Sequence, residues 1–218
     1  MKNIFIVFLT IYFATINLNA QENRVVRDID GNEYKTVVIG NQTWMAENLR
    51  VTHYNDGKPI PMVEDFSVWI SLTAPAYCWY NNNKEQFKDS YGALYNWYTV
   101  DTGKLCPAGW RVPDAEDWDE LVRYAGSNAG GKLKQTGFSH WKDANNGAVD
   151  EYGFTALPGG LRNLNGDFDY MRYSGNWWSA SEHSTENGLL RTMYFANGNA
   201  RQHSYSKNLG LSVRCIRN

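Results

Sequence analysis

Residues 105–118 read LCPAGWRVPDAEDW and open the most strongly patterned segment of the chain. Asp114 follows a proline and can cap a helix that begins at the next residue, and acidic side chains fill the first turn, where they suit the helix dipole. Apolar side chains then recur at intervals of three and four residues: Trp118, Leu121, Val122 and Ala125. Gly126 follows directly, so the pattern predicts an amphipathic helix between Asp114 and Gly126.

Strand patterns lie on both sides of this helix in the sequence. Residues 25–28 and 34–39 flank an Asp-Gly-Asn turn, which is a strong hairpin signal because such turns need a positive φ. Towards the C-terminus, four further segments have strand patterns: 176–181, 189–195, 200–205 and 211–216. Alternation within the last segment directs Cys215 inward. The sequence therefore predicts a β-rich C-terminal third.

The middle of the chain is less regular. Four side chains fall on one face at helical spacing and predict a helix over residues 91–100: Tyr91, Leu94, Tyr95 and Tyr98. Residues 53–89 contain several Pro, Gly and Asn turn signals, so we expect a long loop that carries short strands.

The composition is that of a chain that folds. Its 218 residues include 21 Lys and Arg and 23 Asp and Glu, a formal net charge of −2, and 43% of the residues are hydrophobic. Disordered chains are poor in apolar residues, and electrostatic binding of nucleic acid needs a basic excess, so both classes are excluded. The aromatic content of 15% is the main departure from an ordinary composition.

The first twenty residues read as a separate unit. Lys2 lies in a short basic start, residues 4–16 are apolar apart from two threonines, and Ala20 precedes a polar stretch. The apolar run is shorter than the roughly 20 residues of a transmembrane helix. We expect a secretory signal peptide over residues 1–20, one domain over residues 21–218, and no membrane insertion after cleavage.

Three cysteines occur in this chain: Cys78, Cys106 and Cys215. In an exported protein they allow one disulfide and one remaining thiol. The residues alone permit all three pairings.

Seven blocks, in order along the chain, resemble the Fibrobacter succinogenes major paralogous domain. They are DIDGN at 28–32, WMAENL at 44–49, YGALYNWY at 91–98, LCPAGWRVPDAEDW at 105–118, GFTALPGG at 153–160, WWSASE at 177–182 and SVRC at 212–215. The resemblance covers residues 26–217. It implies a Gram-negative bacterium of the Bacteroidota or Fibrobacterota type, and an exported protein that is secreted, periplasmic or at the cell surface.

This family in turn resembles C-type-lectin-like folds and the formylglycine-generating enzymes. The resemblance implies an α+β, C-type-lectin-like domain with two flanking helices, paired terminal strands and a C-terminal β-meander. In lectin-like domains a cysteine near the first helix bonds the cysteine of the terminal strand. Carried onto this chain, that implies a disulfide between Cys106 and Cys215, with Cys78 left as a free or intermolecular thiol. The aromatic neighbours of Cys78 favour a buried, inert cysteine over a reactive one.

The chain lacks the functional motifs of both the calcium-dependent lectins and the formylglycine-generating enzymes. The Glu-Pro-Asn, Gln-Pro-Asp and Trp-Asn-Asp triplets of calcium-dependent sugar binding are absent, and no cysteine lies between Cys106 and Cys215 to supply the paired thiols of the oxidases. No zinc-binding spacing, phosphate-binding loop or nucleophile elbow occurs. The Asn- and Asp-rich residues 163–169 could bind a cation but read as a turn. We expect no cofactor, no metal and no catalytic residues.

Aromatic and arginine side chains gather in the β-rich third and the loop before it. They suit stacking on a sugar ring or contact with a protein, whereas plain core packing is the alternative for each of them. Because Trp177 and Trp178 are adjacent in a predicted strand, one should point inward and the other outward. Tyr194 and His203 belong to the wider set, and the predicted ligand-binding residues are Tyr170, Arg172, Tyr173, Trp177, Arg191, Arg201 and Tyr205.

These features predict an exported, non-catalytic recognition module that binds a glycan or a protein surface through its C-terminal β region. A structural subunit of a cell-surface assembly is the alternative, with the aromatic face covered by a neighbouring protein. A glycan-acting enzyme is the third possibility, for which no pair of carboxylates stands out.

Overall fold

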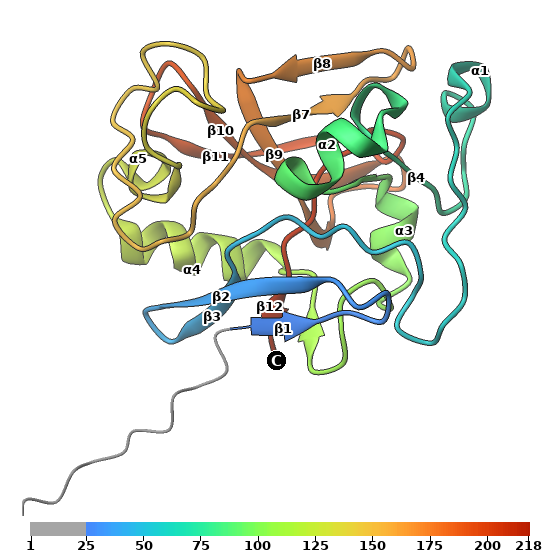
Figure 1. The fold of residues 1–218 in the computed structure, drawn as a ribbon, viewed down its shortest axis with the longest axis horizontal. Coiled ribbons are helices and arrows are strands. Elements are labelled where there is room, and N and C mark those ends of the chain that lie inside the picture. Colours follow the sequence, from blue (N-terminus) through green and yellow to red (C-terminus); the bar gives the residue numbers. More distant parts are fainter. Residues whose placement is uncertain (1–24) are drawn as a thin grey trace, which may run out of the picture.

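Strands from both ends of the described chain meet in one antiparallel sheet. The structure is a computed structural model that describes residues 25–218, so the predicted signal peptide lies outside the described residues. The sheet has the order β1-β2-β3-β12-β6 (Figure 1). Its strands are β1 (Val25–Arg27), β2 (Glu33–Ile39), β3 (Gln42–Met45), β12 (Ile216–Arg217) and β6 (Trp110–Arg111).

The two terminal strands share this sheet but do not pair with each other. β1 pairs with β2, as the hairpin signal predicts, while β12 lies between β3 and β6. The prediction that the terminal strands pair with each other is therefore wrong, although both belong to the same sheet. The predicted strand over 211–216 is also shorter than expected, because Leu211 and Ser212 form only single bridges, to Tyr95 and Trp177.

The helix predicted after Asp114 is confirmed as α4 (Ala115–Ala125). The Asp114 carboxylate accepts a hydrogen bond from the backbone N–H of Asp117 at 2.9 Å, and the Asp117 carboxylate accepts one from the N–H of Asp114 at 2.8 Å. This reciprocal capping box satisfies two backbone donors at the helix start. Gly126 ends the helix with a φ of 70°.

The helix predicted over residues 91–100 is wrong. Its place is taken by the end of α2 (Lys84–Tyr91), by β5 (Leu94–Tyr95) and by α3 (Trp97–Asp101). Gly92 ends α2 with a φ of 73°, and a Cβ atom there would lie 2.5 Å from the carbonyl oxygen of Leu49. The side chain of Asn96 then caps α3. The helix end at Gly92 and the new helix start at Asn96 thus interrupt the segment, although its apolar residues have helical spacing.

The long loop predicted over residues 53–89 contains short elements of its own. They are α1 (Phe66–Trp69), β4 (Tyr77–Cys78), the 3-10 helix η1 (Tyr80–Asn82) and most of α2. β4 pairs with β5. Cys78 is a free thiol and is fully buried, and this burial raises its pKa to about 12. A buried, inert Cys78 agrees with the expectation.

Cys106 and Cys215 form the disulfide that the resemblance implies. Their Cα atoms are 6.0 Å apart and 109 residues apart in sequence. Both residues lie in the main hydrophobic core. The bond ties the segment before β6 to the segment before β12, so it fixes the β12–β6 end of the five-stranded sheet.

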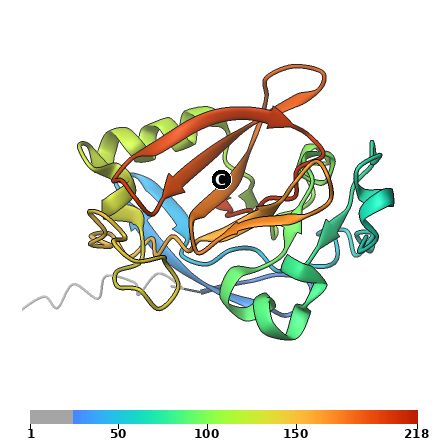
Figure 2. The ribbon, with the colours of Figure 1, turned by 90° about the horizontal axis from the view of Figure 1, so that it is seen from above.

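The C-terminal third forms the predicted β-meander. β9 (Ser174–Glu182), β10 (Asn187–Tyr194) and β11 (Ala200–Ser206) pair in the order β11-β10-β9. β7 (Gly159–Arg162) and β8 (Phe168–Met171) form a hairpin beside them, and α5 (Ala129–Leu133) follows α4. Seen from above, β11 arches over the outer side of the meander (Figure 2). Helices and antiparallel sheets together make the α+β class.

A polar cluster lies inside the core where the two ends of the chain meet. We call Asn48, Trp177, Ser212 and Arg214 the core polar cluster. The Asn48 side-chain oxygen accepts hydrogen bonds from the Trp177 indole at 2.9 Å and from the Arg214 guanidinium at 3.0 Å, and its amide donates to the Ser212 hydroxyl at 3.2 Å. None of the four side chains is more than 3% exposed.

Candidate functional site

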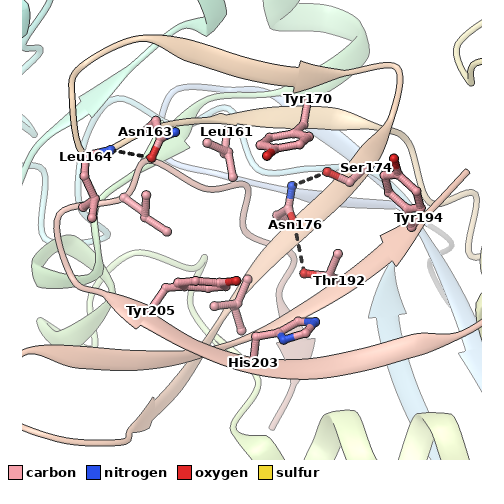
Figure 3. A pocket seen from close by; sticks show the side chains of 12 residues that line it. Leu161, Asn163, Leu164, Tyr170, Ser174, Asn176, Thr192, Tyr194, His203 and Tyr205 are labelled. Atoms are coloured by element: carbon pink, nitrogen blue, oxygen red, sulfur yellow. Dashed lines mark hydrogen bonds between the residues drawn. The ribbon is translucent and has the colours of Figure 1, made fainter.

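A hollow of about 320 Å³ opens on the C-terminal meander (Figure 3). β9 and β10 form its floor, β11 forms one wall and the β7–β8 hairpin forms the opposite wall. We call it the hollow, and it is lined by Leu161, Asn163, Leu164, Tyr170, Ser174, Asn176, Leu190, Thr192, Tyr194, His203, Tyr205 and Leu209.

Strand register explains why these side chains share one face. Thr192 is paired with Asn176 on one side, and Tyr194 is paired with Ser174. On the other side of β10, Leu190 is paired with His203. Because side chains alternate along a strand and paired residues point to the same face, these residues share the face of the sheet that carries the hollow.

A buried arginine holds the hairpin wall in position. Arg162 is fully buried and donates hydrogen bonds to the backbone carbonyls of Val63, Glu64 and Gly166, at 2.7, 2.7 and 3.1 Å. Its guanidinium also lies 4.5 Å from the centre of the Trp69 ring. The wall is therefore anchored to the segment that leads into α1.

Tyr170 reaches the hollow from an unusual backbone position. Its φ is 62°, a left-handed conformation that costs of order 1–3 kcal/mol for a residue other than glycine. Arg172, at the turn into β9, also has a positive φ of 70°. Tyr170 is 53% exposed, and Figure 3 shows it across the hollow from Tyr205, which is 52% exposed. Two aromatic rings thus stand at the rim with about half their surface free.

Three polar side chains of the floor are hydrogen-bonded to one another. The Asn176 amide donates to the Ser174 hydroxyl at 2.9 Å and to the Gly160 carbonyl at 3.2 Å, and its oxygen accepts from Thr192 at 3.0 Å. Asn176 is therefore fixed in orientation. The Ser174 hydroxyl, which accepts from Asn176, still has its own hydrogen to donate, and the Thr192 oxygen can still accept.

Several polar groups around the hollow have no partner within residues 25–218. They are the hydroxyls of Tyr170, Tyr194 and Tyr205 and the ring nitrogens of His203. Half-exposed groups of this kind are hydrated when the hollow holds only water. They are available to a ligand that brings donors and acceptors of its own.

A smaller hollow of about 240 Å³ continues from the first one. The two share Thr192, Tyr194 and His203, and the smaller hollow adds Asn197, Asn199 and Arg201. Arg201 is exposed on β11. This predicted residue thus lies beside the hollow and not in it.

Two of the predicted ligand-binding residues face the other side of the sheet. Trp177 is fully buried against Trp118 of α4, and Arg191 is 4% exposed and pairs with Asp119 of α4 at 2.6 Å. Neither side chain is open to a ligand, so their assignment to the binding surface is wrong. Trp178 is buried as well, and its indole donates to the carbonyl of Tyr95. The expectation that one of the two tryptophans points outward is therefore also wrong.

Arg172 and Tyr173 lie at the turn beyond the hollow and do not line it. The Arg172 guanidinium donates to the carbonyls of Phe138, Ser139 and Trp141, at 3.1 to 3.3 Å, and so fixes a neighbouring loop. Tyr173 packs edge-on against Phe195. Of the seven predicted residues, the structure brings only Tyr170 and Tyr205 together in the hollow.

The small polar residues of the floor were missed by the sequence analysis. Ser174, Asn176 and Thr192 carry no individual signal, because short polar side chains are common in strands and turns. Alternation along 189–195 does place Thr192 on the same face as Tyr194. The register of β9 against β10 is needed to add the other two.

In residues 25–218, no group of three or more His, Cys, Asp or Glu side chains is arranged to hold a metal ion. In the same residues, no helix is both long and apolar enough to cross a membrane.

These elements define an α+β domain whose C-terminal meander carries a hollow with tyrosines at the rim and a polar floor. Residues 37–217 match the Fibrobacter succinogenes major domain, and the chain belongs to that family. The family that the sequence blocks indicated is therefore confirmed, and six of the seven blocks lie within the matched residues. Comparison with curated proteins found no match, and comparison with solved structures found none either.

Proposed function

We propose that this chain is an exported, non-catalytic recognition module of C-type-lectin-like architecture, which binds a glycan or a protein surface through the hollow. One observation carries the proposal: two half-exposed tyrosines, Tyr170 and Tyr205, face each other across a concave and hydrogen-bonded floor. Tyrosines with free ring surface and free hydroxyls are typical of binding sites, because one side chain offers both apolar and polar contacts.

The lining of the hollow supports binding over turnover. None of its twelve residues is Asp, Glu, Lys or Cys, so it offers neither a carboxylate pair nor an activated nucleophile. Its one histidine, His203, lies beside the Tyr205 ring and has no acidic partner among the described residues. A glycan-acting enzyme would need a catalytic carboxylate from elsewhere.

The test is retention of candidate ligands by the purified protein. The protein would be applied to immobilised glycans and to cell-envelope protein fractions, together with Tyr205→Ala and Tyr170→Asn variants. Asparagine is chosen at position 170 because it tolerates a positive φ. Loss of binding in both variants, with an unchanged circular dichroism spectrum, supports the proposal. Binding that neither variant weakens rejects it.

A structural subunit of a surface assembly is the second candidate. It is favoured by exposed apolar side chains on α1 and on both sides of it in sequence, at the edge of the molecule (Figure 1): Met62, Phe66, Val68 and Ile70, exposed by 51%, 62%, 48% and 44%. Contiguous exposed apolar surface often marks a protein contact. This candidate predicts a stable oligomer or complex on size exclusion, whereas a module that acts alone elutes as a monomer.

A further inference from the structure

We propose that the ligand of the hollow is an uncharged sugar residue of a short oligosaccharide, whose next residue enters the smaller hollow beside Arg201. This inference rests on the proposed function and narrows its ligand to one chemical class. Its support comes from the charge, the hydrogen-bonding groups and the shape of the lining.

The lining offers no charged side chain that could pair with an ionised group of a ligand. Asp, Glu, Lys and Arg make up 20% of the chain, yet none of them is among the twelve residues that line the hollow. A charged group that enters such a site loses water and gains no opposite charge in return. A neutral ligand avoids this cost.

The mixture of apolar and polar groups matches a sugar ring. A pyranose has apolar C–H faces and a rim of hydroxyls, each of which both donates and accepts. The half-exposed rings of Tyr170 and Tyr205 can cover the faces from opposite sides. The Ser174 hydroxyl can donate to a hydroxyl of the sugar. Polar groups of Thr192, Tyr194 and His203 also line the hollow and can bind further sugar hydroxyls. A purely apolar ligand would leave these groups without partners.

The shape of the site favours a short oligosaccharide over a protein surface. A volume of about 320 Å³ lies at the small end of the range for ligand pockets, roughly 300–1,000 Å³. A stable protein contact needs a much wider surface, about 800 Å² on each partner. The second hollow, of about 240 Å³, shares three lining residues with the first, so a chain can continue along β10 and β11 without leaving the surface.

Binding of defined oligosaccharides to the purified full chain tests the inference. The uncharged probes are oligomers of two to six units from cellulose, xylan, mannan and laminarin, and oligogalacturonate is the charged probe. We expect titration calorimetry to show binding of at least one uncharged series. Oligogalacturonate should bind at least tenfold more weakly or not at all.

Variants connect this binding to the hollow. Tyr205→Ala and Tyr170→Asn should each weaken the uncharged probe at least tenfold, and Thr192→Val, which removes a hydroxyl at nearly constant shape, about fivefold. Tyr124→Ala is the matched control, because Tyr124 is 56% exposed on α4 and does not line the hollow. It should leave binding unchanged.

The outcomes separate this inference from the proposed function. Preference for oligogalacturonate, or no binding of any uncharged probe, overturns the inference. If a protein partner is then captured by the wild type and lost in Tyr205→Ala, the proposed function survives without the sugar. If Tyr205→Ala, Tyr170→Asn and Thr192→Val leave the binding of every sugar and protein ligand unchanged, both the inference and the proposed function are rejected.

Discussion

The core polar cluster and the hollow both use side chains of β9, yet they differ in burial and in how far their polar groups are paired. In the cluster, Arg214 is fully buried, and it donates to Asn48 and to the carbonyls of Phe154 and Thr155. In the hollow, three tyrosine hydroxyls have no partner within residues 25–218. The polar groups of the core polar cluster bind other parts of the chain, whereas those of the hollow are available to a ligand.

The same contrast appears in the sequence. All four residues of the core polar cluster lie in blocks that identify the family, whereas none of the twelve residues that line the hollow lies in any of the seven blocks. The blocks therefore describe a scaffold. A family assignment based on them rests on residues outside the hollow, and it says little about the ligand that the hollow accepts.

Removal of the disulfide should have the largest effect on stability. Replacement of Cys106 and Cys215 by serine opens a loop of 109 residues, which the chain-entropy model values at about 4–5 kcal/mol. Urea unfolding of the double variant and of the oxidised wild type measures the difference. Cys78→Ala is the control, since it removes a buried thiol without opening a loop and should cost about 1–2 kcal/mol. Equal losses in the two variants would mean that the bond adds nothing beyond packing.

Arg214→Met should have the second largest effect and lower the free energy of unfolding by about 3 kcal/mol. The substitution nearly keeps the side-chain length, but it removes the buried donor of hydrogen bonds to two backbone carbonyls and to the Asn48 side chain. Arg201→Met is the matched change at an exposed site and should alter the free energy of unfolding by less than about 0.5 kcal/mol. If the two variants have the same stability, Arg214 does not hold the core together in the way its contacts indicate.

Local signals in the sequence predicted much of the scaffold. Asp114 and Gly126 mark the ends of α4 correctly because capping depends on residues close in sequence. The helix predicted over 91–100 failed because Gly92 must make room for the carbonyl of Leu49, a contact between distant segments. The disulfide required the family resemblance, since three cysteines alone leave three pairings open.

The candidate site was predictable only in part. The gathering of aromatic side chains in the C-terminal third and the loop before it, together with the lectin-like resemblance, was enough to include Tyr170 and Tyr205 among the seven predicted residues. The misassignment of Trp177 and Arg191 has one cause: α4 covers the opposite face of the meander, and nothing in the local pattern says which face a helix from another part of the chain will cover. Asn176 was missed because its importance comes from its partners across the sheet.

Asn176 lines the hollow and precedes Trp177 of the core polar cluster in the chain, and its replacement should have an intermediate effect. Asn176→Ala removes hydrogen bonds to Gly160, Ser174 and Thr192, of which the first two are buried, so we expect a loss of about 1–2 kcal/mol. Asn165→Ala changes an exposed turn residue and is the control. Thermal unfolding of both variants gives the comparison. A neutral Asn176→Ala would show that the floor contributes to the hollow but not to the fold.

Tyr205→Ala should have the smallest effect on stability, within about 0.5 kcal/mol of the wild type, because half of the ring already faces solvent and its hydroxyl has no partner in the described chain. Urea unfolding of Tyr205→Ala beside Arg214→Met measures both regions under the same conditions. A loss above about 2 kcal/mol for Tyr205→Ala would contradict the comparison, since it would make this tyrosine part of the core. If the stability is unchanged while ligand binding falls, the rim of the hollow can vary without harm to the scaffold. Members of one family could then share a core and bind different ligands.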